Sequence, residues 1–215
     1  MSTDEARIRS EKLSRALSQV NEMHKILGSD LNHAIDFARR YPSQFADRTL
    51  IRTYAALIEG TSYQLRSCVL EFAADYPGTF STHEIMVLAE RKHSLNQWGE
   101  VELVKDNYRS TLPLLLLTIR CYGRLCAVDF HPKVKEGNHP TQGWQSTRAF
   151  FALRDELAHP KNPQSMNIDD SHRQLGEETL KWFNGELSRL GRAAIDKLPH
   201  LRVEETGVKM RLWDI

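Results

Sequence analysis

Cysteine is scarce in this sequence, and its spacing carries no motif. Cys68, Cys121 and Cys126 make an odd set without a CxxC pair. A disulfide-held secreted domain needs paired cysteines, and a structural zinc site needs closely spaced ones. The sequence therefore predicts neither. This usage is typical of a reducing compartment, so we expect a cytoplasmic protein.

Long apolar runs are also missing. The first residues, MSTDEARIRSEKLSRAL, are charged throughout and lack the apolar stretch of a signal peptide. The most apolar run, from Leu112 to Ile119, is far shorter than the roughly 20 residues that span a bilayer. We expect this run to be a buried helix, and we expect no contact with membranes.

Neither sign of charge dominates the chain. It has 29 basic and 28 acidic residues, a net charge of +1, so the molecule as a whole has no long-range attraction for a polyanion. Any contact with nucleic acid must therefore be local. The chain also lacks internal repeats, low-complexity segments and a Gly-rich phosphate loop. Its length fits one domain, with or without a helical extension.

Apolar residues recur at helical spacing along most of the chain, and no stretch combines strict alternation with hairpin turn residues. The sequence thus predicts an all-α helical bundle. The first forty residues predict two helices broken at Gly28, and residues 129–143 predict a surface loop. The other helices are expected at about 47–76, 81–91, 104–128, 144–159 and 171–198.

Local motifs mark the start of one predicted helix and a candidate kink in another. Ser81 or Thr82, with Glu84, predicts a capping box, and Pro113 is a candidate kink. The tail is compatible with a short strand pair around Thr206 and Gly207. We therefore expect an N-terminal helical extension (1–46), a helical domain (47–198) and a C-terminal tail (199–215).

The segment FFALRDELAHPKN, residues 150–162, gathers side chains suited to phosphate chemistry. His159 has an imidazole that can exchange protons near neutral pH. Arg154 has a permanently charged guanidinium that can grip a phosphate with two hydrogen bonds. On a continuous helix, Arg148, Asp155 and His159 share one stripe, and Arg154 lies roughly 140° from His159. Asp155 is therefore the better placed residue to orient the imidazole.

Arg154, Asp155 and His159 resemble the signature of the HEPN superfamily: an arginine, a polar residue, three further residues and a histidine that closes a bundle helix. The following HPKN, and the segment IRTYAALIEGTSYQLR with Glu59 in mid-helix, are also similar to this family. The resemblance covers residues 47–198. It implies a core of four to five helices and, in most members, a homodimer.

The resemblance also implies a function. Catalytic members cleave RNA without a metal or cofactor and leave 2′,3′-cyclic phosphate and 5′-hydroxyl ends, often as toxins, antiphage proteins or stress-response enzymes, some with an antitoxin or regulatory partner. Other members bind RNA, nucleotides or proteins without catalysis. The expected catalytic residues here are Arg154, His159 and Asp155, supported by Glu59. Substrate contacts are expected from Arg148, Lys161 and Asn162.

The same residues also fit plainer roles. Arg154 can simply pair with Glu59 and tie two core helices together. His159 can be attracted by the dipole at a helix C-terminus, and Asp155, Lys161 and Asn162 can be solvated surface residues. Trp144, Phe150 and Phe151 fit core or dimer contacts better than base-stacking platforms.

Two other kinds of site find little support. His131, His139 and His159 each precede a proline, but their spacing matches no common set of metal ligands. Cys68 lies in the apolar part of a helix, where a thiol usually serves as inert packing.

Overall fold

The computed structural model describes residues 3–76, 78–95, 101–106 and 111–197. It is an all-α bundle with two small strand pairs, so the predicted fold class is confirmed. In chain order the elements are α1 (Thr3–Arg40), α2 (Gln44–Phe72), η1 (Ala73–Asp75), α3 (Thr82–Leu88), β1 (Arg91–Leu95), β2 (Val101–Asp106), α4 (Thr111–Leu125), β3 (Lys135–Glu136), β4 (His139–Pro140), α5 (Gln142–Ala158), η2 (Pro163–Met166) and α6 (Asp170–Lys197). The predicted strand pair of the tail lies outside the described residues.

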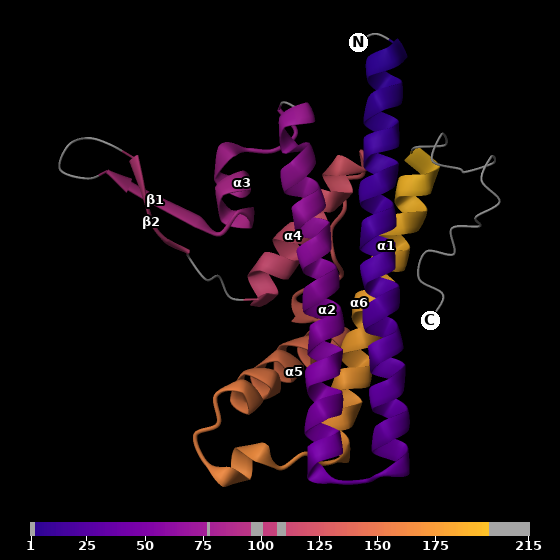
Figure 1. Ribbon diagram of the computed structural model, residues 1–215, viewed down its shortest axis with the longest axis vertical. Helices are drawn as coiled ribbons and strands as arrows, with labels where there is room; N and C mark the ends of the chain where they lie inside the picture. Colours follow the sequence, from indigo (N-terminus) through magenta and orange to yellow (C-terminus); the bar gives the residue numbers. More distant parts are fainter. Residues whose placement is uncertain (1–2, 77, 96–100, 107–110, 198–215) are drawn as a thin grey trace.

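The long helix α2 is the centre of the bundle. It contacts α1, α4, α5 and α6, and Figure 1 shows α1, α2 and α6 running along the long axis with α5 inclined to them. The ring of Tyr54 on α2 meets that of Phe150 on α5 edge to face, with centroids 6.4 Å apart. Phe150 and Phe151 are buried, and Trp144 packs on Trp182. These aromatic residues therefore serve the core, as the sequence favoured.

The predicted helix break at Gly28 is wrong, because α1 is one continuous helix. A glycine inside a helix costs only about 1 kcal/mol relative to alanine. Val20 and Leu31, on either side of it, are buried in the core, and the Nδ1 atom of His24 lies 3.0 Å from the Thr61 hydroxyl of α2. Packing against α2 therefore outweighs the weak local signal.

A hairpin replaces part of an expected helix. β1 and β2 pair antiparallel, with an irregularity between Lys92 and His93, so the prediction that no hairpin exists is wrong. The helix expected from residue 104 begins instead at Thr111. Pro113 thus lies in the first turn of α4, where its missing N–H needs no partner. Within the loop 129–143, β3 and β4 form a two-residue pairing.

The short helix α3 directly precedes the first strand of the hairpin. Its predicted capping box is confirmed: the Ser81 hydroxyl accepts from the Glu84 N–H, and the Glu84 carboxylate accepts from the Ser81 N–H. The helix ends at Leu88, after which Glu90 has a positive φ of 52°. This turn directs Glu90 towards the face of α2 that carries the candidate site.

Candidate functional site

The predicted motif closes α5 and lies beside α2. The helix ends at Ala158, and His159 leaves helical geometry with φ −131° and ψ 65°. Its backbone N–H still donates to the Asp155 carbonyl at 2.9 Å. Because His159 is no longer on the helix, the helical angle that separated it from Arg154 does not apply.

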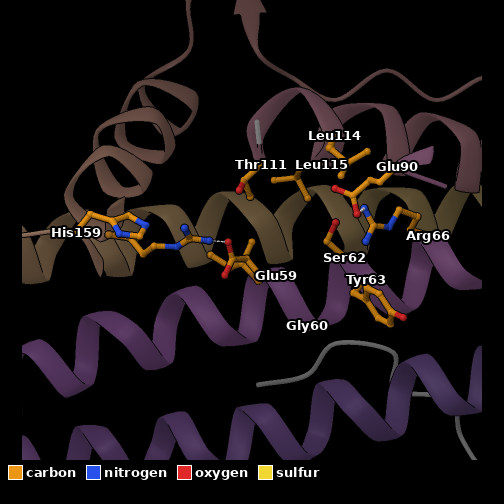
Figure 2. Close-up of a pocket in the computed structure, with 12 residues that line it drawn as sticks. Glu59, Gly60, Ser62, Tyr63, Arg66, Glu90, Thr111, Leu114, Leu115 and His159 are labelled. Atoms are coloured by element: carbon orange, nitrogen blue, oxygen red, sulfur yellow. Dashed lines mark ion pairs between the residues drawn. The ribbon is translucent and has the colours of Figure 1, made fainter. Parts of the chain in front are cut away.

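Arg154 and His159 line one cleft of about 590 Å³, between α2, the start of α4 and the end of α5. Figure 2 shows His159 at one end of this cleft, Arg66 and Glu90 at the other, and Glu59 between them. His159 is exposed, and the Arg154 side chain is 25% exposed. Both groups are therefore open to a ligand from solvent.

Two carboxylates hold the Arg154 guanidinium. Its Nη2 atom forms an ion pair with Oε1 of Glu59 on α2, and its Nη1 atom donates to Oδ1 of Asp155 at 2.7 Å. The same guanidinium lies 5.8 Å from the centre of the Phe151 ring. The predicted pairing with Glu59 is confirmed. It fixes the position of Arg154 and also neutralises much of its charge.

Asp155 contacts Arg154 through its side chain and His159 through its backbone. Its carboxylate is 66% exposed. In the part of the chain that the structure describes, no hydrogen bond joins the side chains of Asp155 and His159. The role of Asp155 in orienting the imidazole therefore stays a prediction, and the contact that it makes is to the guanidinium.

The three predicted substrate-binding residues fall in different places. Lys161 and Asn162 line a second cavity, of about 350 Å³, which His159 shares. The Asn162 side chain accepts from the Ser165 N–H and so caps η2. Arg148 is exposed on α5 and lines neither cavity as the structure describes them.

The cleft includes a second charged cluster that the sequence analysis missed. Arg66 forms an ion pair with Glu90 at 2.8 Å, and its guanidinium lies 5.2 Å from the centre of the Tyr63 ring. Glu59, Tyr63 and Arg66 follow the i, i+4, i+7 spacing of one helix face, so this part could have been found from the sequence. Glu90 could not, because only tertiary packing brings it there.

The cysteine thiols lie outside the cleft and are buried. Burial raises the pKa of the Cys68 and Cys126 thiols to about 12, so neither is a nucleophile near neutral pH. Among the described residues, no group of three or more His, Cys, Asp or Glu side chains could hold a metal ion. No described helix has both the length and the apolar character needed to cross a membrane.

The cleft therefore offers one imidazole for proton transfer and one fixed guanidinium for an anion, next to a second pair of charges. This set can bind a phosphate ester and exchange a proton with it. Comparison of the chain with protein-family models, with curated proteins and with solved structures finds no match in any of the three.

Proposed function

We propose that this chain is a metal-independent endoribonuclease of the HEPN type. The observation that carries this proposal is that Arg154 and His159 line the same solvent-open cleft. An RNA phosphodiester placed there would contact a guanidinium and an imidazole together. The proposed biological setting is a toxin–antitoxin, antiphage or stress response, with RNA as the substrate and an antitoxin or regulatory protein as a further partner.

The proposed reaction is attack by the ribose 2′-oxygen on the adjacent phosphorus. The 2′-hydroxyl loses its proton to a base, the new P–O bond forms, and the P–O5′ bond breaks as the 5′-oxygen gains a proton. The products are a 2′,3′-cyclic phosphate and a 5′-hydroxyl. His159 acts as the general acid or base, and Arg154 stabilises the charge on the phosphorane oxygens.

The ion pairs of Arg154 fit this role in different ways. Glu59 lies on the long helix α2 and holds the guanidinium from one side. Asp155 is mostly exposed, so its carboxylate can turn to solvent when a phosphate takes its place. In this proposal Glu59 positions Arg154, and Asp155 is the partner that the substrate displaces.

Cleavage of total RNA in the presence of EDTA tests the proposal. His159→Ala and Arg154→Ala should each reduce cleavage at least about a hundredfold. Two matched controls should not: His139→Ala, an exposed histidine that also precedes a proline, and Arg192→Ala, an exposed arginine on α6. If both cleft variants folded normally by circular dichroism and cleaved RNA at the wild-type rate, the proposal would be contradicted.

The neutralised guanidinium also favours a second candidate. Arg154 has two carboxylate partners, and the chain as a whole is nearly neutral, which suits a binding module better than a general RNA cutter. In that case the wild type binds RNA, a nucleotide or a protein partner without cutting RNA. Binding of RNA that Arg154→Ala weakens, with no cleavage by the wild type, would identify this function.

A further inference from the structure

The end of the cleft away from His159 is built from side chains that the proposed reaction leaves unused. Tyr63 and Arg66 come from α2, and Glu90 from the turn after α3. The Arg66 guanidinium lies between the Glu90 carboxylate and the Tyr63 ring. Tyr63 is 55% exposed, so its ring remains open to a planar ligand.

The backbone of Glu90 suggests that its carboxylate matters at this place. Its φ of 52° is in the left-handed region, where glycine is the usual residue after a helix and other residues are strained. Its N–H donates to the Val87 carbonyl, as in a helix C-terminal turn. A glycine would satisfy the same turn but could not reach Arg66, so the side chain is the feature that glycine cannot replace.

The helix α2 sets the spacing between the two charged clusters of the cleft. Glu59, which holds Arg154, and Arg66 are seven residues apart on α2, or about 10 Å along its axis. This is comparable with the length of a nucleotide from its phosphate to the outer edge of its base. A phosphate at Arg154 and His159 would therefore place its own base at Tyr63, Arg66 and Glu90, as the layout in Figure 2 allows.

We propose that Tyr63, Arg66 and Glu90 form a nucleobase subsite that prefers bases with an exocyclic amino group. The base stacks on Tyr63. One carboxylate oxygen of Glu90 is paired with Arg66, and the other accepts from the amino group. Adenine, cytosine and guanine carry such a group and uracil does not. This inference rests on the proposed function, because it takes the phosphate to lie at Arg154 and His159.

Calorimetric titration with the four nucleoside 3′-monophosphates tests the subsite directly. The wild type should bind the adenosine, cytidine and guanosine compounds about tenfold more tightly than the uridine compound, the effect of one good hydrogen bond to a base edge. Tyr63→Ala should weaken the binding of all four nucleotides about tenfold or more, whereas Tyr63→Phe, which keeps an aromatic ring, should bind them as tightly as the wild type. Glu90→Gln should remove the preference for amino-bearing bases.

Tyr41→Ala is the matched control, since Tyr41 is 62% exposed and lies just past the end of α1, outside the residues that line the cleft. Equal binding of all four nucleotides, no measurable binding, or wild-type binding by Tyr63→Ala would each overturn the inference. RNA cleavage by the wild type, measured in parallel, reports on the proposed function alone. Cleavage of RNA without a preference among the nucleotides would contradict only the proposed subsite. Preferential nucleotide binding without RNA cleavage would contradict only the proposed nuclease function.

Discussion

Arg154 depends on Glu59 for its position. The pair joins α5 to α2, and both side chains are partly exposed, so its contribution to the free energy of unfolding is at most about 1 kcal/mol. We predict that a double-mutant cycle of Glu59→Gln and Arg154→Gln, followed by urea unfolding, gives a coupling energy in this range.

The effect of Glu59 on activity should be larger than its effect on stability. Because Glu59 fixes the guanidinium, Glu59→Gln should lower kcat for RNA cleavage while KM changes little. A variant that cleaves RNA at the wild-type rate would mean that the ion pair is only a link between two helices.

His24 makes the stability of the fold depend on pH. Burial lowers the pKa of His24 from 6.5 to about 4. The unfolded chain therefore binds a proton below about pH 6.5, whereas the folded chain does so only below about pH 4. The free energy of unfolding should fall as the pH is lowered through this window, by up to about 3 kcal/mol at about 1.4 kcal/mol per pKa unit.

His24→Gln keeps a polar group near Thr61 and removes the titration. Its unfolding free energy, from urea denaturation between pH 7 and 4, should show a shallower pH dependence than that of the wild type. If the unfolding free energies of the two proteins depended on pH in the same way, the pKa of His24 would not be lowered in the folded chain, and the prediction would be wrong.

Helix α6 allows a matched test of packing at the scale of an element. A Cβ atom added at Gly176 would lie 2.8 Å from the Tyr54 ring, whereas one added at Gly185 meets no atom within 4 Å in the described part of the chain. The Tyr54 ring is itself held by Phe150 and cannot simply turn away.

We predict opposite signs for the two alanine substitutions. Gly176→Ala should lower the free energy of unfolding by about 1–3 kcal/mol because the helix must move away from Tyr54. Gly185→Ala should raise it by up to about 1 kcal/mol through helix propensity. Urea midpoints measure both, and stabilisation by Gly176→Ala would show that α6 and α2 are less tightly packed than the structure has them.

Helices whose packing agrees with their local pattern could be predicted from the sequence. The predicted helices that became α2, α3, α5 and α6 are present. The prediction failed where local and tertiary signals disagree. Gly28 lies in a helix that α2 supports, and the sequences of β1 and β2, RKHSL and VELVKD, do not alternate strictly between apolar and polar residues.

In the candidate site, too, some features could be predicted from the local sequence and others depend on tertiary packing. Arg154 and Glu59 could be paired from the sequence because a buried helix face rarely leaves a carboxylate without a partner. The joint exposure of Arg154 and His159 in one cleft could not, because it depends on His159 leaving the helix at its last turn. Glu90 is brought to the cleft by a turn after α3 that only the folded chain reveals.

At the scale of the whole molecule, the number of imidazoles in the cleft bears on the oligomeric state. Among the described residues that line the cleft, His159 is the only imidazole, and cleavage needs both a proton acceptor and a donor. A two-fold dimer would bring a second His159 to the same phosphate. We therefore predict a homodimer, with twice the chain mass of 24.8 kDa in light scattering.

Dilution should then reduce the cleavage rate per chain once the dimer dissociates. A protein that is monomeric in light scattering, and that cleaves RNA at a rate per chain independent of concentration, would contradict this arrangement.

The most direct measurement of the central claim is the chemical analysis of the RNA ends that the purified protein produces in EDTA. If Arg154 and His159 act on one phosphodiester, the wild type should leave 2′,3′-cyclic phosphate and 5′-hydroxyl ends, and both should disappear with His159→Ala and with Arg154→Ala. Ends of the opposite kind, 3′-hydroxyl and 5′-phosphate, or the same ends from the two variants at the wild-type rate, would contradict the account.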